Sequence, residues 1–301
     1  MMHYPRLSEE LFTIRDWLRF TVSRFEESGI FFGHGTDNSY DEAAWLILAA
    51  LHLPHDTLEN FLDAVITESE RKHLAHLIER RITERIPTAY LVREAWLRGF
   101  KFYVDERVIV PRSFIAELLE DSLSPWIESP EMVESAADIC TGSGCLGILL
   151  AHAFPNALVD VVDISPDAIA VCNINIANYG LQQQVTAIQS DMFSALKGKT
   201  YDLIISNPPY VDAPSMAQLP QEYRNEPQLA LGSGVAGLDH THTLLREAAN
   251  YLNNGGLLIV DIGRNRDALL EAYPDLPFIW LEVESGNEFV FLLTKEQLVG
   301  S

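Results

Sequence analysis

From about residue 130 onward, short apolar runs alternate with helical segments, and this alternation constrains the fold more than any other feature of the sequence. Apolar runs at 136–140, 157–162, 185–189, 201–206 and 257–262 are predicted strands. Strands that alternate with helices form a doubly wound, mostly parallel sheet. Two further runs, 278–284 and 288–293, flank Ser285-Gly286-Asn287 and predict an antiparallel hairpin that closes the sheet. The fold class is therefore α/β.

The first 87 residues follow a different period and predict a small helical bundle. Apolar residues recur at three- and four-residue steps over 11–25, before Gly29, and over 74–82, before Pro87. Thr67 and Glu70 have the spacing of a capping box at the start of the second of these helices. We expect another helix from about residue 41, with Ser39 as a cap, and a further segment from about residue 57.

Between residues 95 and 111 the apolar period shortens to about two, which predicts a β-hairpin with its turn near 105–107. This change of period indicates a connection between two domains. We therefore expect a helical domain at 1–87, a linker with the hairpin at 88–112, and the α/β domain at 113–301.

The formal net charge of −22 disfavours a protein that grips a nucleic-acid backbone through basic residues. An acidic enzyme attracts a basic protein instead, although negative charge can equally serve solubility alone. The longest apolar runs, such as 43–53, are shorter than the roughly 20 residues that cross a bilayer, and residues 1–6 carry no apolar signal core. Three cysteines form no C-x-x-C pair. We expect a cytoplasmic protein with a basic protein partner and no membrane.

Two groups of histidines have spacings that a metal site could use. His73 and His76 lie three apart on a predicted helix, and Asp239 precedes His240 and His242. Neither group has a third ligand in a suitable context, so we assign both to solvated surface and expect no metal.

A glycine-rich turn follows the first strand of the predicted sheet and precedes a helix. It contains Asp138, Cys140, Thr141, Gly142, Ser143 and Gly144. Glycine lets a ligand press against the backbone, where a Cβ would collide with it. The pattern G-x-G-x-x-G is also satisfied, so the turn by itself leaves a dinucleotide open beside an adenosyl cofactor.

Acidic residues follow the next two strands. Asp163 could accept hydrogen bonds from both ribose hydroxyls of an adenosyl group, or it could cap the following helix. Asp191 could meet the edge of an adenine, with capping as its alternative role.

The string Asn207-Pro208-Pro209-Tyr210 follows the fourth predicted strand and indicates the chemistry. Its two prolines stiffen the chain, so the preceding carbonyls are fixed and free to accept hydrogen bonds. The Asn207 side chain and the Pro208 carbonyl can each accept one hydrogen of a planar –NH₂ group while the Tyr210 ring packs against its plane. Such a site orients an amide nitrogen, a poor nucleophile, towards a methyl donor.

Together these residues resemble class I S-adenosylmethionine methyltransferases that act on planar nitrogens, and in particular the protein glutamine N5-methyltransferases. The stretches 103–113, 33–37 and 222–227 resemble the branch that modifies the third ribosomal protein of the large subunit, before or during assembly, because Pro111-Arg112-Ser113 stands where release-factor enzymes usually have Pro-Arg-Pro. The resemblance implies a helical N-terminal domain, a hairpin linker and a seven-stranded catalytic domain.

The resemblance also implies the site residues. Cofactor contacts fall on Asp138, Cys140, Thr141, Gly142, Ser143, Gly144, Asp163, Asp191, Met192 and Asn207, and glutamine contacts fall on Asn207, Pro208, Pro209 and Tyr210. Met192 stands where related enzymes often have an aromatic residue, so its adenine contact is open.

Four other functions remain as alternatives. The same reaction could act on peptide-chain release factors, or the four-residue string could hold an adenine of a nucleic acid. The glycine pattern could serve a nicotinamide-dependent oxidoreductase, and a non-catalytic ribosome-assembly factor could keep the fold without the reaction.

Overall fold

The computed structural model describes residues 7–300, and the stretch 1–6, where the sequence predicts no signal core, lies outside the described residues. The chain forms two units. One contains the described residues up to Ala95 together with Val104–Glu106 and Leu219–Asn225. The other contains Trp96–Tyr103, Arg107–Gln218 and the residues from Glu226 onward. No helix among the described residues is long and apolar enough to span a membrane.

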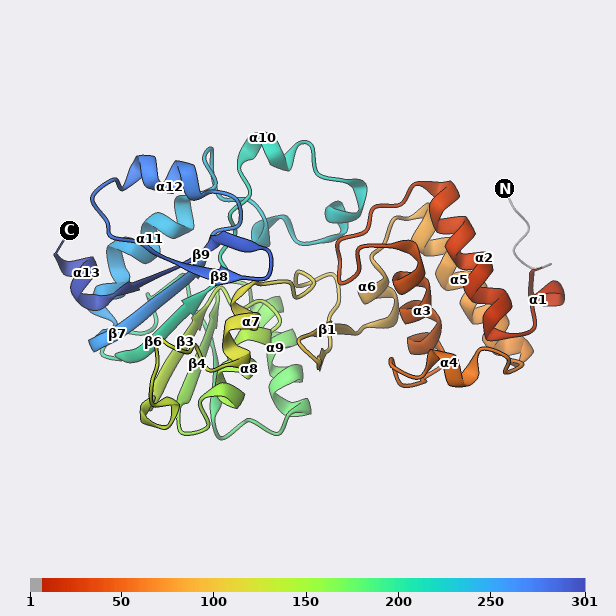
Figure 1. The fold of residues 1–301 in the computed structure, drawn as a ribbon, viewed down its shortest axis with the longest axis horizontal. Helices are drawn as coiled ribbons and strands as arrows, with labels where there is room; N and C mark the ends of the chain where they lie inside the picture. The colour runs from red at the N-terminus through yellow and green to blue at the C-terminus, as the bar shows by residue number, and fades with distance from the viewer. Residues whose placement is uncertain (1–6, 301) are drawn as a thin grey trace. The chain divides into compact units, whose positions relative to one another are not determined.

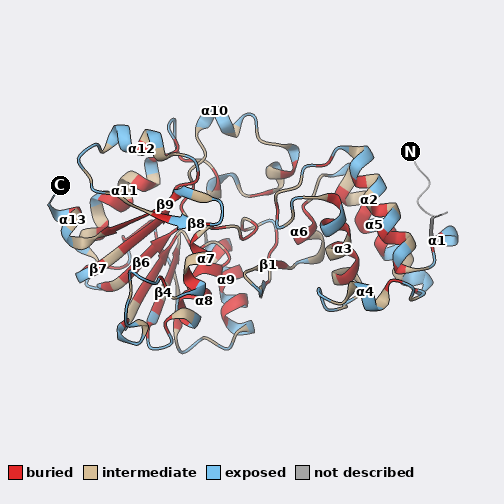
Figure 2. Cartoon of the chain, viewed as in Figure 1, coloured by how far each residue is buried: buried red, intermediate tan, exposed pale blue. Residues whose placement is uncertain are grey.

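The N-terminal unit is helical, as the sequence predicts (Figure 1). Its helices are α1 (Leu7–Glu10), α2 (Ile14–Ser28), α3 (Ser39–Ala50), α4 (Leu58–Phe61), α5 (Glu68–Thr83) and α6 (Thr88–Val92). A capping box of Thr67 and Glu70 starts α5, and Gly29 ends α2 in the left-handed conformation at φ 54°. The cap of α3 is Asn38 and not Ser39, which is the first helical residue. Figure 2 shows the buried faces of α2, α3 and α5, whose largest side chains include Trp17 and Phe25.

A buried ionic network joins distant parts of this unit. Arg81 on α5 is 1% exposed and pairs with Glu42 on α3 and with Glu222. Glu222 belongs to a short 3₁₀ helix, η3 (Gln221–Asn225), and also accepts a hydrogen bond of 3.0 Å from the Phe31 amide. A segment from the second half of the sequence is therefore part of the helical unit, which the sequence did not predict.

The second unit is built on a seven-stranded sheet with the strand order β5-β4-β3-β6-β7-β9-β8. The strands are β3 (Ser135–Ile139), β4 (Leu158–Asp163), β5 (Val185–Gln189), β6 (Tyr201–Ser206), β7 (Leu252–Asp261), β8 (Ile279–Val283) and β9 (Gly286–Thr294). The pairs among β3 to β7 are parallel, whereas β9 runs antiparallel to both β7 and β8. This confirms the predicted α/β class, its mostly parallel sheet and the closing hairpin.

Helices cover both faces of the sheet (Figure 1). The helices of this unit are α7 (Ile115–Glu120), α8 (Cys145–Ala153), α9 (Pro166–Asn178), α10 (Ala213–Met216), α11 (Asp239–Glu247), α12 (Arg266–Ala272) and α13 (Lys295–Val299), with the 3₁₀ turns η2 (Pro130–Met132), η4 (Gln228–Ala230) and η5 (Ala248–Asn250). One face packs against α11, α12 and α13 through a cluster that includes Leu244, Leu269 and Leu298. The other face packs against α8 and α9.

The strand order reverses at β3, which pairs with β4 on one side and with β6 on the other. The register places Ile139, the last residue of β3, opposite Val162 and Ser206. The carboxyl ends of these strands therefore meet at one edge, which is where doubly wound sheets bind ligands.

The predicted hairpin is present, but the predicted position of its turn is wrong. Its strands are β1 (Ala95–Leu97) and β2 (Phe100–Phe102), so the turn lies at Arg98-Gly99 and not near 105–107. Both turn residues have positive φ, 47° and 78°, as a tight two-residue hairpin loop requires. The later alternation of Val108 and Val110 comes from an irregular segment outside any strand, in which both side chains are buried.

Candidate functional site

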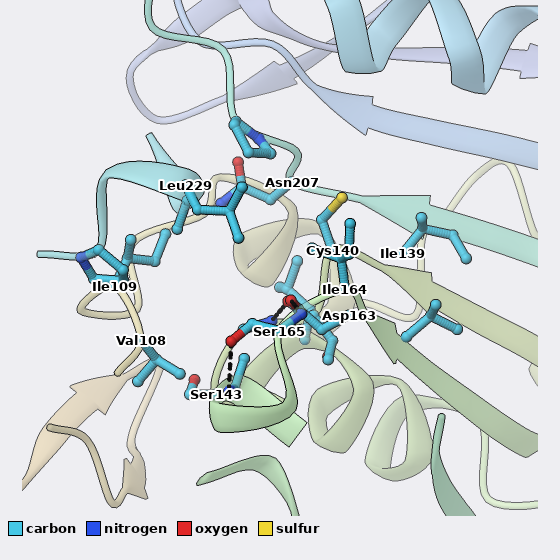
Figure 3. Close-up of a pocket in the computed structure, with 18 of the residues that line it drawn as sticks. Val108, Ile109, Ile139, Cys140, Ser143, Asp163, Ile164, Ser165, Asn207 and Leu229 are labelled. Carbon is cyan, nitrogen blue, oxygen red and sulfur yellow. Dashed lines mark hydrogen bonds between the residues drawn. The ribbon is translucent and has the colours of Figure 1, made fainter. Parts of the chain in front are cut away.

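A pocket of about 1040 Å³, including its open mouth, lies at the carboxyl ends of β3, β4, β5 and β6. All of its lining residues belong to the α/β unit. Figure 3 shows Asn207 and Leu229 towards one end of the pocket and Asp163, Ser165 and Ser143 towards the other. A pocket of this size accommodates a ligand as large as a nucleoside cofactor.

The glycine turn after β3 forms one wall. Cys140, Thr141, Gly142 and Ser143 line the pocket, and the backbone is left-handed at Cys140 (φ 63°) and Gly142 (φ 56°). Gly144 is not among the lining residues, because it faces α9, and a Cβ there would lie 2.5 Å from the Cys172 sulfur. Gly144 therefore permits close packing between the turn and α9. Gly142 permits the turn to bend towards the pocket.

Asp163 ends β4 and faces the glycine turn across the pocket wall. Its Oδ2 accepts a hydrogen bond of 2.9 Å from the Gly142 amide, and its Oδ1 accepts one of 2.9 Å from the Ser165 amide. Ser165, and not Asp163, caps α9 by accepting from the Ala168 amide at 3.2 Å. The alternative capping role of Asp163 is therefore wrong, and its oriented carboxylate keeps lone pairs for a ligand. Burial raises the pKa of this carboxyl group.

Asp138 lies beneath the turn and does not line the pocket. It accepts hydrogen bonds from the Thr141 hydroxyl and, at 3.0 Å, from the Gly147 amide, so it ties the turn to the start of α8. Full burial raises the pKa of its carboxyl group to about 7. Its Oδ1 is buried and has no hydrogen-bond partner among residues 7–300. Asp138 therefore stabilises the glycine turn from behind and does not itself face the pocket.

The string at 207–210 follows β6, whose last residue, Ser206, donates a 2.6 Å hydrogen bond to the Ile139 carbonyl. Asn207 and Pro209 line the pocket, whereas Pro208 and Tyr210 are not among its lining residues. Asn207 Oδ1 is buried, and within the described chain it has no hydrogen-bond partner. An acceptor left in this state is costly unless a ligand satisfies it.

Asp191 and Met192 follow β5 and both line the pocket. Residues 190–200 form turns and contain no helix, so Asp191 has no helix to cap there. Met192 has a left-handed φ of 45°, is 9% exposed, and places its sulfur 3.8 Å from that of Cys140. The two sulfur-containing side chains thus form one soft, apolar part of the wall.

Much of the opposite wall was not predicted from the sequence, although two of its segments, 103–113 and 222–227, carry the family resemblance. The wall residues come from the linker and from the segment after residue 226: Arg107, Val108, Ile109, Pro111, Arg112, Ser113, Pro227, Leu229 and Ala230. The side chain of Glu226 joins the two segments, accepting two hydrogen bonds of 2.7 Å from Arg112 and one of 3.0 Å from the Val110 amide. The pairing of Arg112 with Glu226 could not be predicted from local periodicity, because the two residues lie far apart in the sequence.

His240 was also assigned to surface by its sequence context, but it lines the pocket. Its Nδ1 lies 2.8 Å from the Ser233 hydroxyl, and burial lowers the pKa of its ring. His242, by contrast, points to Tyr273, whose hydroxyl lies 2.8 Å from its Nδ1.

Comparison with known proteins identifies the family. Residues 120–222 match the family model of the Methyltransferase small domain. A relative from Neisseria meningitidis, named ribosomal protein uL3 glutamine methyltransferase, is 58% identical and covers 100% of this chain and 99% of its own. One of the same name from Bordetella pertussis is 52% identical and covers 96% and 97%. The solved catalytic domain of hMettl16, in complex with a MAT2A 3′UTR hairpin, has a TM-score of 0.50 at 11% identity over 77% of this chain and 84% of that one, and so shares its fold. With relatives this similar over the whole length, the chain belongs to the family of ribosomal protein uL3 glutamine methyltransferases.

Proposed function

We propose that this methyltransferase transfers the methyl group of S-adenosylmethionine to the side-chain amide nitrogen of a glutamine in ribosomal protein uL3. The observation that carries the proposal is the buried acceptor Asn207 Oδ1, which has no partner within residues 7–300 and belongs to the same pocket as Asp163. The relatives from Neisseria meningitidis and Bordetella pertussis, 58% and 52% identical to this chain, are named ribosomal protein uL3 glutamine methyltransferase.

The residues of the pocket fit the cofactor. Asp163, already oriented by two backbone amides, would accept the ribose hydroxyls through its remaining lone pairs. The turn from Cys140 to Ser143 would support the methionine part, with Asp191 and Met192 near the adenine. When bound, S-adenosylmethionine supplies an electrophilic methyl group on a sulfonium, so the protein need provide neither a nucleophile nor a metal.

The task of the protein is to prepare a weak nucleophile. An amide nitrogen shares its lone pair with the carbonyl group, and attack requires that the lone pair be freed and aimed. Asn207 Oδ1 and the Pro208 carbonyl would each accept one amide hydrogen, fixing the –NH₂ group in line with the methyl group. The nitrogen held in this way would receive the methyl group that the sulfonium supplies, and one amide proton would pass to water, giving N5-methylglutamine.

The two thiols and the histidine ring that line the pocket are neutral, which agrees with a reaction that uses no nucleophile from the protein. Burial raises the pKa of the Cys140 thiol, and it raises that of the Cys145 thiol to about 12, so both stay protonated at neutral pH. The lowered pKa of His240 keeps that ring neutral. A covalent cysteine mechanism therefore has no support from the pocket.

The charge of the chain fits the proposed partner. A net charge of −22 favours approach of a basic ribosomal protein and disfavours nucleic acid. We also propose that the reaction takes place in the cytoplasm, on uL3 before or during assembly of the large subunit.

The test is a transfer assay with labelled S-adenosylmethionine and a panel of acceptors. The panel contains undermethylated uL3, peptide-chain release factors, duplex DNA and RNA, each offered to the wild type and to Asn207→Ala. We expect label on uL3 with the wild type alone. Label on release factor or nucleic acid, with none on uL3, would overturn the choice of substrate.

A further inference from the structure

The loop between β7 and α12, residues 262–265, lies outside the pocket lining, and its residues contact Tyr210 at the end of the string 207–210. We propose that Gly263 and Asn265 in this loop are positioning residues for the methyl-transfer site. The proposal rests on the proposed function, and it assigns Tyr210 the role of an anchor.

The first contact is between Gly263 and the ring of Tyr210. A Cβ on Gly263 would lie 2.6 Å from Cε2, 2.9 Å from Cδ2 and 3.0 Å from Cζ of Tyr210. The first two distances are shorter than real Cβ atoms show and the third is very tight, so the ring lies directly against the glycine backbone. Gly263 also has a φ of 54°, which a side chain would strain. Both features make glycine the residue that this position requires.

The second contact is between Asn265 and the backbone of Tyr210. Asn265 Nδ2 donates hydrogen bonds of 2.7 Å to the Tyr210 carbonyl and 3.2 Å to the Gly237 carbonyl. Gly237 approaches so closely that a Cβ there would lie 2.3 Å from the Tyr210 oxygen. One side-chain amide thus fixes two backbone segments at the end of the string.

Asn265 occupies the cap position of α12, and this makes its side-chain contacts informative. An asparagine at the start of a helix usually bonds a backbone amide of the first turn. Asn265 makes no such bond, and its side chain turns to Tyr210 and Gly237 instead. Its replacement therefore removes contacts to the site while leaving the capping of α12 unchanged.

Asp261, the last residue of β7, joins this loop to the opposite wall of the pocket. Asp261 Oδ1 accepts from the Gly263 amide at 3.0 Å, which fixes the bend of the loop. Its Oδ2 accepts from the Ser113 hydroxyl at 2.9 Å and from the Phe114 amide at 3.0 Å. Ser113 lines the pocket. The end of β7 and the loop after it therefore link the linker wall to the anchor of the string.

These contacts explain how the pocket acceptors keep their geometry. Pro208 and Pro209 stiffen the string between Asn207 and Tyr210. Contacts that fix the position of Tyr210 therefore also restrict the position of Asn207. A shift of about 1 Å at a reacting group can cost about 100-fold in rate. We expect Asn265→Ala to lower kcat by about 10- to 100-fold, with little change in the KM for uL3.

The first experiment compares Asn265→Ala with Asn253→Ala as a matched control. Asn253, like Asn265, donates from its side-chain amide, in a hydrogen bond of 2.7 Å to Asp202, but it lies at the far end of β7. Steady-state methylation is measured together with the calorimetric affinity for S-adenosylhomocysteine and the melting temperature. A positioning role predicts a fall in kcat for Asn265→Ala alone, with its cofactor affinity unchanged. Equal kcat in both variants, or parallel losses of kcat, affinity and melting temperature, would overturn it.

A double-mutant cycle tests the Gly263 contact. Gly263→Ala is expected to lower kcat in the wild-type background, because the added methyl group displaces the Tyr210 ring. In the Tyr210→Ala background the ring is gone, so the same change should cost clearly less activity, because only the strain of a side chain at positive φ remains. An equal loss in both backgrounds would show that Gly263 acts without Tyr210 and would refute the inference.

Hydrogen exchange does not depend on catalysis, so it tests the positioning role separately from the proposed function. Hydrogen exchange at the Asn207, Tyr210 and Val211 amides should be faster in Asn265→Ala than in Asn253→Ala. If exchange is faster in Asn265→Ala but the methyl label is found on an acceptor other than uL3, the positioning role stands and only the proposed substrate is refuted. Unchanged exchange and full kcat, with label on uL3, would refute the positioning role alone.

Discussion

Replacement of Asp163 by alanine tests how the pocket holds its cofactor. The carboxylate is fixed by the Gly142 and Ser165 amides, and we propose that it also accepts the two ribose hydroxyls. Hydrogen bonds to a charged group contribute about 1.5 kcal/mol or more each. Loss of both should therefore cost about 3 kcal/mol, which corresponds to about 100-fold weaker binding.

Isothermal calorimetry with S-adenosylhomocysteine measures this loss directly. Asp163→Asn keeps one acceptor oxygen without the charge and should lie between alanine and the wild type, about tenfold weaker than the latter. Asp167→Ala is the matched control, because Asp167 is exposed in the first turn of α9 and is not among the pocket-lining residues.

Binding of S-adenosylhomocysteine by Asp163→Ala within about threefold of the wild type would refute this role of the carboxylate. The same role is also refuted if Asp167→Ala weakens binding as much as Asp163→Ala does, because the effect would then be one of general charge. A melting temperature measured for each variant shows whether loss of the two backbone contacts has unfolded the site.

Three further predictions follow from single contacts. Asn207→Ala should lower kcat on uL3 by about 100-fold under saturating cofactor, because one acceptor for the amide is lost; steady-state kinetics measures this. The folded-state pKa of Asp138 is raised from 3.8 to about 7, so the folded state binds a proton between these values and the free energy of unfolding should fall as pH rises through this window. Urea titrations should show that slope, at most about 1.4 kcal/mol per pH unit from this group, reduced in Asp138→Asn. Gly147→Ala should destabilise the fold by about 1–3 kcal/mol in the same assay, because its Cβ would lie 2.0 Å from Val161 Cγ1; an unchanged midpoint would contradict the packing described behind the turn.

The sequence predicted the features of the fold that depend on local periodicity. Apolar runs marked every strand of the sheet, and the Thr67/Glu70 capping box marked the start of α5. The carboxyl ends of parallel strands meet at one edge, so the glycine turn, Asp163 and Asn207 could be assigned to one site before the structure was known.

The parts that the sequence could not predict depend on pairs of distant residues. The bonds from Arg112 to Glu226 and from Arg81 to Glu222 join segments more than a hundred positions apart. Neither pair leaves a periodic signal, so the linker wall and the place of residues 219–225 in the helical unit were missed. The turn at Arg98 was missed because a non-glycine residue adopts positive φ there.

The central claim is that the methyl group is transferred to a glutamine amide nitrogen of uL3. The most direct measurement is tandem mass spectrometry of uL3 after reaction with labelled S-adenosylmethionine, followed by acid hydrolysis of the labelled peptide. A methylated amide nitrogen releases its label as methylamine, and the account predicts methylamine from one glutamine-containing peptide. Label released as methanol, or label that resists hydrolysis on a carbon or lysine nitrogen, would contradict it.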